Sequence, residues 1–429
     1  MDLHPRPQAI AATRLGRPRS GPQRLVGLVV RPPIRRYRCD RRVPRHDRAL
    51  LPAAVVGGLV ELSLAMASGE IVMKFLFLTS GRRTPSTRFR MLPLAERLNE
   101  AGHRCVVSHS FPEKYDYFPK LGFRPSQWLK RACRRVDLWR ARWGRFDAVI
   151  LERELFDNPT WDLETSLRTA ARTLVLDIDD GVFLKFPEKF ARLLELADLV
   201  VVGNRALAQW AEAAHPHVVI VPTCIDTETY RPRTLASEAP AIPARAVIGW
   251  IGTAGNVEYL RELAGPLRNL ARLHDFEFQV IAGNPGVLAE LPLSGVKVAF
   301  RTWNPATEAT DILDFDIGVM PLTDDPWSRY KCGLKLLQYM AVGLPGVASP
   351  VGVNRDIIRH GENGFLAATA EQWETSLGEL LTAPELRRRI GTEALATVRQ
   401  HYSLQVQLPR WLEAVESSIA RQADAPRHT

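Results

Sequence analysis

The chain is poor in the residues and spacings that hold metal ions or crosslink small secreted domains. It has five cysteines in 429 residues, with no Cys-x-x-Cys pair and no Cys/His cluster. This excludes a disulfide framework and gives no sign of a zinc site. The histidines show no metal-ligand spacing, and neither a Walker loop nor a nucleophile elbow occurs. We therefore expect no metal and a reducing, cytoplasmic location.

Lysine is absent from residues 1–72, although these hold 13 arginines. With five acidic residues they carry a formal charge of +8, whereas the rest of the chain carries only +2 of the total of +10. Because the basic excess belongs to one end and the remainder is nearly neutral, we expect no nucleic-acid partner.

Residues 1–72 do not show the pattern of a domain. Their longest apolar run, residues 49–67, contains Pro52 and Glu61. It is preceded by too many residues for a signal peptide and is marginal as a membrane span. We favour a translation start that has been assigned too far upstream, because a strand pattern begins directly after Met73. A disordered basic tail and a targeting or membrane segment are the alternatives.

From Lys74 onward, short apolar runs alternate with helical segments, the first of which is a helix expected over 90–101. Strands are expected at 74–79, 104–108, 147–151, 173–178, 198–202, 218–222, 246–251, 277–282, 296–300, 316–321 and 346–349. Continuous Val/Ile/Leu runs of this kind are typical of parallel sheets that are covered on both faces. The pattern predicts two Rossmann-like α/β domains facing each other across a cleft, over residues 73–225 and 246–405. A linker is expected at 226–245, and a helix with a tail at 406–429. Ligands bind at the carboxyl ends of such strands, so the cleft is the expected site.

The most informative segment runs from Tyr330 to Ser349. A glycine turn feeds a helix whose first turns hold Lys331 and Lys335, where cations are disfavoured by the helix dipole. A bound anion such as a diphosphate would explain both lysines. The alternative is an ordinary helix-turn-strand with two solvated lysines.

This segment resembles the carboxy-terminal signature of glycosyltransferase family 4, which reads Glu, seven residues, Glu-Ala-Met-Ala-x-Gly-x-Pro-Val-Val-Ala. Residues 222–227, 352–358 and 360–366 resemble other family segments, in the right order. The resemblance implies a GT-B glycosyltransferase. Such an enzyme would move a sugar from a nucleotide-sugar donor to a glycan, lipid-linked or small-molecule acceptor, with retention and without metal or cofactor.

The resemblance also implies a donor site, with departures from the family. Gln338 stands where the family has the glutamate that holds the ribose, and Tyr330 stands where it has the glutamate that contacts the sugar. A Gln338→Glu change is therefore expected to tighten donor binding. The family's diphosphate-clamping Arg and Lys are replaced by a small-residue loop, residues 252–256. The expected donor-binding residues are Gly252, Thr253, Gly255, Arg329, Tyr330, Lys331, Gly333, Leu334, Lys335 and Gln338, of which Lys335 is also expected to be catalytic.

Charged groups at other strand ends indicate the acceptor side. Asp179 and Asp180 follow a buried strand and are candidates for holding or deprotonating an acceptor hydroxyl; the alternative is a strand-end turn. Four arginines follow the first strand, with a solvated turn as the alternative. Glu152, Arg153 and Glu154 follow the third strand and can reach the cleft, with an ion-paired loop as the alternative. The expected acceptor-binding residues are Arg82, Arg83, Arg88, Arg90 and Glu152.

Residues 128–145 form a basic helical segment with a tryptophan stripe. Trp128, Trp139 and Trp143 fall on one helical face with Ala132 and Val136. Such a helix can lie on an anionic membrane surface, which would place the protein peripherally on the inner face of a membrane. The alternative is that the stripe packs onto the first domain.

Two other functions compete with a transferase. A sugar-nucleotide epimerase or phosphorylase of the same fold would use the same cleft. A non-catalytic protein that binds a nucleotide sugar or glycan is favoured by the replacements at Tyr330 and Gln338.

Overall fold

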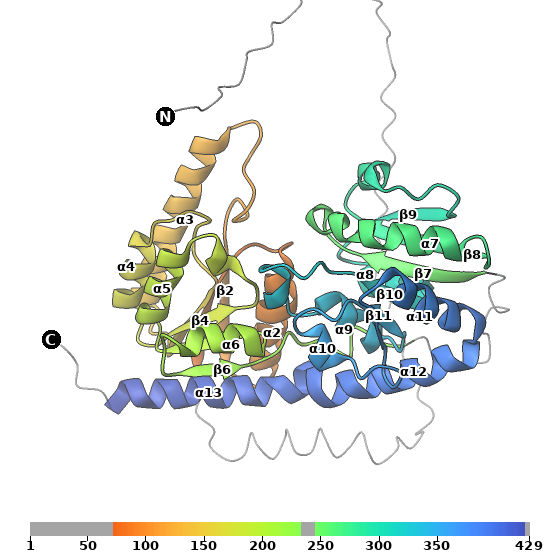
Figure 1. Cartoon of the computed structure of the whole chain (residues 1–429). Helices are drawn as coiled ribbons and strands as arrows, with labels where there is room; N and C mark the ends of the chain where they lie inside the picture. The colour runs from red at the N-terminus through yellow and green to blue at the C-terminus, as the bar shows by residue number, and fades with distance from the viewer. Residues whose placement is uncertain (1–71, 233–244, 425–429) are drawn as a thin grey trace, which may run out of the picture. The chain divides into compact units, whose positions relative to one another are not determined.

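The computed structural model describes residues 72–232 and 245–424 (Figure 1). Residues 1–71, most of the expected linker and the last five residues lie outside this part. The expectations for the N-terminal extension therefore concern residues that are not described.

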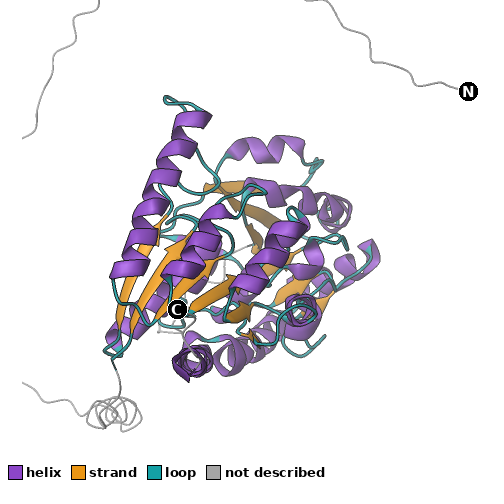
Figure 2. Ribbon diagram, turned by 90° about the vertical axis from the view of Figure 1, so that its left-hand side faces the viewer, coloured by secondary structure: helices purple, strands orange, loops and turns teal. Residues whose placement is uncertain are grey.

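The first domain is built on a six-stranded parallel sheet in the order β2-β1-β3-β4-β5-β6. Its central strands are continuous apolar runs and are buried along their whole length, because helices cover both faces (Figure 2). In register, Leu76 of β1 pairs with Val106 of β2 and Val149 of β3. The strands are β1 (Lys74–Thr79), β2 (Arg104–His109), β3 (Ala148–Glu152), β4 (Leu174–Ile178), β5 (Leu199–Val202) and β6 (Val218–Ile220).

Most helices of this domain bury an apolar face, whereas the buried face of α3 is mostly polar and charged. A π-helical turn, η1 (Thr87–Met91), leads into α2 (Leu92–Glu100), so the helix expected over 90–101 starts earlier and in a wider turn. The others are α3 (Phe123–Trp143), α4 (Asp162–Ala170), η2 (Val182–Leu184), α5 (Pro187–Leu196) and α6 (Arg205–Glu212).

The second domain repeats the plan with the parallel order β12-β11-β10-β7-β8-β9. Its strands are β7 (Ala246–Ile251), β8 (Phe276–Ala282), β9 (Val298–Thr302), β10 (Ile317–Met320), β11 (Gly346–Ala348) and β12 (Phe365–Leu366). Its helical segments are η3 (Ala254–Leu263), α7 (Ala264–Leu270), η4 (Pro285–Glu290), α8 (Glu308–Asp311), η5 (Ile312–Asp314), η6 (Ser328–Tyr330), α9 (Leu334–Ala341), α10 (Asn354–Ile357), α11 (Ala370–Thr382), α12 (Pro384–Thr397) and η7 (Val398–Tyr402).

The last helix, α13 (Leu404–Asp424), returns to the first domain (Figure 1). Its fully buried Trp411 stacks on Phe77 at 6.0 Å between ring centroids and meets the edge of Phe75 at 5.9 Å. Both phenylalanines belong to β1, so the C-terminal helix completes the core beneath the first sheet. The expected fold class, two Rossmann-like domains, is confirmed. None of the helices in the described residues is long and apolar enough to cross a membrane.

Candidate active site

A cavity of about 530 Å³ lies at the carboxyl ends of strands from both sheets. Its walls come from the loops after β1, β3 and β4 in the first domain and from those after β7, β8, β9 and β10 in the second. This is the place where open parallel sheets bind ligands. The charged residues on its walls are Arg83, Arg88, Arg90, Arg153, Asp179, Asp180, Glu308, Lys331 and Lys335.

The N-terminus of α9 opens into this cavity. Its cap residue, Gly333, has a φ of 70°, and a Cβ there would lie 2.6 Å from the side chain of Ile357. Only glycine fits this turn without strain. The turn brings Gly333, Leu334 and Lys335 to the cavity wall, together with Lys331 just before it. Free N–H groups and two cations are thereby concentrated at one point, as an anion site requires.

Lys335 is the cation of this group that forms no hydrogen bond or ion pair with any residue the structure describes. Its ammonium lies over the ring of Trp250, 5.8 Å from the ring centroid. Burial and, second, the charge of Lys331 lower the pKa of Lys335 to about 7, although Asp180 opposes the shift. Lys331, by contrast, donates to Asn256 Oδ1 at 3.2 Å.

The small-residue loop after β7 makes room for Lys335. A Cβ at Gly252 would lie 2.9 Å from Cε of Lys335 and 2.5 Å from the ring of Trp250. Gly252 and Thr253 line the cavity, whereas Gly255 does not. The loop that replaces the family's Arg and Lys thus lets a lysine from α9 reach the same space.

Gln338 is buried and holds a polar cluster at the back of the cavity. Its Nε2 donates to Glu308 Oε1 at 2.7 Å and to the hydroxyl of Tyr230 at 2.9 Å. Glu308 in turn forms an ion pair with Arg88 of the first domain, whose guanidinium lies 5.1 Å from the ring centroid of Trp303. A carboxylate therefore stands beside Gln338, contributed by a different element.

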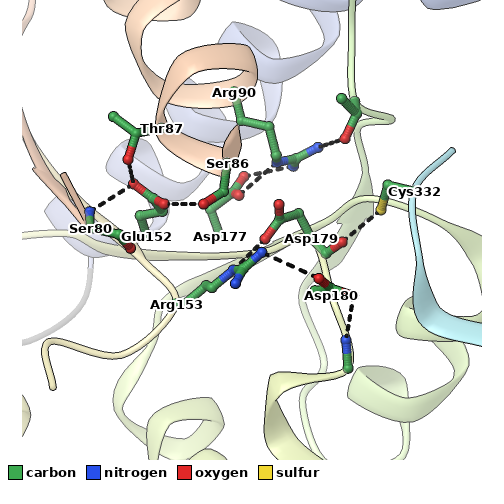
Figure 3. A network of polar contacts seen from close by, with 12 residues as sticks. Ser80, Ser86, Thr87, Arg90, Glu152, Arg153, Asp177, Asp179, Asp180 and Cys332 are labelled. Atoms are coloured by element: carbon green, nitrogen blue, oxygen red, sulfur yellow. Dashed lines mark hydrogen bonds and ion pairs between the residues drawn. The ribbon is translucent and has the colours of Figure 1, made fainter. Parts of the chain in front are cut away.

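Asp179 and Asp180 lie on the opposite wall and share Arg153 (Figure 3). Arg153 Nε donates to Asp179 at 2.6 Å, and its Nη2 lies 3.6 Å from Asp180. Burial opposes ionisation of Asp179, but Arg153 outweighs it and lowers the pKa of that carboxyl. The pKa of Asp180 is raised, first by burial and also by Asp179. Asp180 is consequently the better proton acceptor of the two.

Arg90 is committed to the structure of the first domain. Its Nε and Nη2 each donate to Asp177 at 2.8 Å (Figure 3). Its Nη1 donates to the carbonyl of Val221 at 2.9 Å. The side chains of Arg90 and Asp177 are almost fully buried, although Arg90 touches the cavity. Its donors are therefore taken up by protein groups rather than left for an acceptor.

Glu152 is also used internally. It is 1% exposed and does not line the cavity. Its carboxylate accepts from Ser80 N at 3.0 Å, from Thr87 Oγ1 at 2.6 Å and from the hydroxyl of Ser86 (Figure 3). It fixes the turn between β1 and η1, which presents Arg83 and Arg88 to the cavity.

Three further expected residues lie off the cavity wall. Arg82 is exposed and does not contribute to the wall; Arg329 is exposed and pairs with Asp324 at 2.7 Å. Tyr330 packs its ring on Phe183 of the first domain, 4.9 Å between centroids. The structure thus brings together Arg83, Arg88, Arg90, Asp179, Asp180, Gly252, Thr253, Lys331, Gly333, Leu334, Lys335 and Gln338.

The sequence did not point to Trp303 and Glu308, whereas Arg153 belongs to the segment after the third strand that could reach the cleft. Arg153 has a φ of 58°, which is unusual for a residue other than glycine, and it follows a buried strand. Its position next to Glu152 was a usable signal. Trp303 and Glu308 lie in a polar stretch after β9 that has no motif, and only the folded chain shows that they face α9.

The tryptophan stripe of α3 lies on the surface. Trp128 is 70% exposed, and Trp139 and Trp143 are each 64% exposed. The alternative that the stripe packs onto the first domain is therefore wrong. The opposite face is the packed one: Arg134 donates to the carbonyl of Thr79 at 2.6 Å.

Comparison with known proteins agrees with this architecture. Residues 245–383 match the family model of glycosyl transferases group 1. The expected resemblance to GT-B glycosyltransferases is thereby confirmed, and the match lies on the domain that contributes α9. No curated protein sequence matches the chain.

Solved structures of low sequence identity share the fold. Sucrose-phosphate synthase from Thermosynechococcus elongatus is 14% identical, with a TM-score of 0.63 over 81% of this chain and 100% of that chain. A glycosyltransferase from Rickettsia africae is 14% identical, with a TM-score of 0.60 over 82% of this chain and 99% of that chain. HepE from Anabaena, solved in complex with UDP and glucose, is 16% identical, with a TM-score of 0.56 over 80% of this chain and 100% of that chain.

Proposed function

We propose that this protein is a glycosyltransferase that moves a sugar from a nucleoside diphosphate sugar to a glycan, lipid-linked or small-molecule acceptor, with retention and without metal or cofactor. The observation that carries the proposal is the unpaired amine of Lys335. It stands beside the N-terminus of α9, in a cavity formed by both domains. A diphosphate supplies the charge that this amine lacks.

The donor lies along the second domain in this proposal. The diphosphate takes the N–H groups at the start of α9, Lys335 and Lys331, with the backbone of Gly252 and Thr253 close by. The nucleoside lies towards Gln338 and Glu308. Similar structures hold related ligands, since HepE was solved with UDP-glucose.

The reaction breaks the bond between the anomeric carbon and the diphosphate oxygen, and an acceptor oxygen bonds to that carbon. Negative charge grows on the departing diphosphate, where the helix N-terminus and the two lysines stabilise it. The acceptor hydroxyl loses its proton to Asp180, or to the departing phosphate, while Arg153 keeps Asp179 ionised as a hydroxyl ligand.

Metal-independent action rests on these cations. Lys331, Lys335 and Arg88 occupy the cavity wall, where a divalent ion would otherwise balance the diphosphate. Among residues 72–232 and 245–424, no group of three or more His, Cys, Asp or Glu side chains is placed to hold a metal ion.

A thermal-shift screen with nucleotides and nucleotide sugars tests the donor assignment. Ligands that bind the native state raise the melting temperature. We expect a nucleoside diphosphate to stabilise the wild type and to lose most of this effect in Lys335→Met. If no nucleotide shifts the melting temperature, the proposal is wrong.

Product analysis with the best donor separates the competing functions. A transferase hydrolyses the donor slowly without an acceptor and releases nucleoside diphosphate. An epimerase returns a changed nucleotide sugar, a phosphorylase requires phosphate, and a pure binding protein leaves the donor intact. We also propose that the protein works in the cytoplasm, peripherally on the inner face of a membrane, which the exposed tryptophans of α3 support.

A further inference from the structure

Exposed apolar residues are concentrated in one segment of the described chain. Of the 14 exposed large hydrophobic residues in the described part, nine fall between 111 and 143. Seven of the nine are aromatic. The nine are Phe111, Tyr115, Tyr117, Leu121, Phe123, Trp128, Val136, Trp139 and Trp143. Exposed patches of this kind mark surfaces that meet a partner.

These residues form one strip along α3 and the loop before it. At 1.5 Å per residue, the helix is about 30 Å long. Trp128, Val136, Trp139 and Trp143 follow its outer face, and Tyr117 meets the edge of Phe123 at 6.2 Å at its start. The helix and its loop extend past the neighbouring helices in both views (Figures 1 and 2). We call this strip, residues 111–143, the α3 surface.

Arginines that form no ion pair with a described residue border the strip. Arg124, Arg135, Arg142 and Arg145 are exposed and form no ion pair with any residue that the structure describes. The only acid on α3, Asp137, is buried and already paired with Arg134 and Arg140. Because local carboxylates do not neutralise this face, its partner must supply the negative charge.

We infer that the α3 surface docks on an anionic lipid bilayer, which deepens the peripheral location in the proposed function. Tryptophan rings favour the boundary between polar and apolar layers, and arginines beside them reach lipid phosphates. A bilayer offers both layers along the whole length of a straight helix. The strip lies parallel to the membrane plane, with α3 at the headgroup level.

Vesicle sedimentation tests this inference without any donor or acceptor. The probes are vesicles of phosphatidylcholine alone and vesicles with about 30% phosphatidylglycerol, at low salt. We expect wild-type protein to sediment with the anionic vesicles only, to dissociate at about 1 M salt, and to show a blue shift of tryptophan fluorescence when bound.

Two variants separate the apolar and the charged parts of the surface. Trp139→Glu with Trp143→Glu is expected to lower vesicle partitioning at least tenfold. Arg135→Gln with Arg142→Gln removes two surface charges and is expected to lower it about 25-fold. The control is Arg272→Gln with Leu273→Glu, an exposed basic and apolar pair on the second domain, which should bind like the wild type.

Thermal melting shows whether each variant is folded. If the tryptophan variant is unfolded, the vesicle binding of the arginine variant decides the test. The inference is overturned if the wild type stays in the supernatant with anionic vesicles, or if both variants sediment as the wild type does. It is also overturned if the wild type ignores vesicles but self-associates through the tryptophans. Because the assay needs no nucleotide, its failure leaves the transferase proposal intact, and a failed nucleotide screen leaves this inference intact.

Discussion

The titration of Lys335 offers a quantitative test of the donor site. In the free protein its pKa is about 7, because burial removes water from the ammonium and Lys331 repels it. A diphosphate next to this amine favours the charged form and raises the pKa again. Lys335→Met removes one charge-assisted contact, which is worth about 1.5–3 kcal/mol, or about 10- to 150-fold in affinity.

The sign of the pH dependence follows from this shift. Below pH 7 Lys335 is already protonated and binding needs no proton. Above pH 7 the free amine is neutral, so binding takes up a proton and the affinity falls by up to about tenfold per pH unit. The expected uptake per nucleotide is about 0.1 proton at pH 6, about 0.5 at pH 7 and about 0.9 at pH 8.

Titration calorimetry in buffers of different ionisation enthalpy measures this uptake directly. A nucleotide sugar is the right probe, because both of its phosphates are esterified and do not titrate in this range. Lys335→Met should bind more weakly and without the uptake. Lys297→Met, which removes an exposed lysine paired with Asp275 on the same domain, should behave like the wild type.

The reasoning would be refuted by an affinity that stays constant from pH 6 to 9 together with zero uptake at pH 8. A second consequence concerns the free protein. Because the folded-state pKa lies below the unfolded value of 10.5, the unfolded chain binds more protons between about pH 7 and 10.5. Over that window the unfolding free energy of the wild type should rise relative to that of Lys335→Met.

Three other side chains have distinct expected effects. Arg90→Met should lower the free energy of unfolding by about 3–5 kcal/mol in denaturant titrations, because it leaves the buried Asp177 without its bidentate partner. Asp180→Asn should lower kcat by about 10²- to 10⁴-fold with nucleotide affinity unchanged, as expected for a group that handles the acceptor proton. Gln338→Glu should destabilise the free protein by about 1–3 kcal/mol, because it replaces a donor to Glu308 with a second carboxylate.

Each of these has a control that isolates the cause. Arg90→Met combined with Asp177→Leu should recover part of the lost stability; no recovery would mean that the pair is not the source. Asp157→Asn, an exposed acid paired with Lys185, should leave kcat unchanged. For Gln338→Glu, adding Glu308→Gln restores one carboxylate and one amide, and a double variant as unstable as the single one contradicts the argument.

The architecture was readable from the sequence because buried parallel strands leave a strong local pattern. Strands at 74–79 and 246–251 have the expected bounds, and the other nine expected strands agree within two residues at each end. β12 was missed because it has two residues and follows a turn, so no periodicity can reveal it. The return of α13 to the first sheet was also missed, since an amphipathic helix does not specify which core it covers.

The candidate site was only partly readable, for a different reason. Charged residues after strands are expected to bind ligands, yet Arg90 pairs with Asp177 and Glu152 accepts hydrogen bonds from Ser80, Ser86 and Thr87, all within the first domain. Whether a charged side chain is free or already paired depends on residues far away in the chain. That Lys335 lies on the cavity wall could be inferred from its own helix, because the conflict between a cation and the helix N-terminus is local.

Gln338 shows most clearly how a motif can mislead about charge. Compared position by position with the family, the site has lost a carboxylate, and Gln338→Glu seemed a restoration. In the folded protein Glu308 places a carboxylate 2.7 Å from the Gln338 amide, within the same cavity wall. A bound ligand responds to the electrostatic field at its own location, whichever position in the sequence supplies the charge. The cavity therefore retains its negative group beside α9, and the amide serves to hold that group in place.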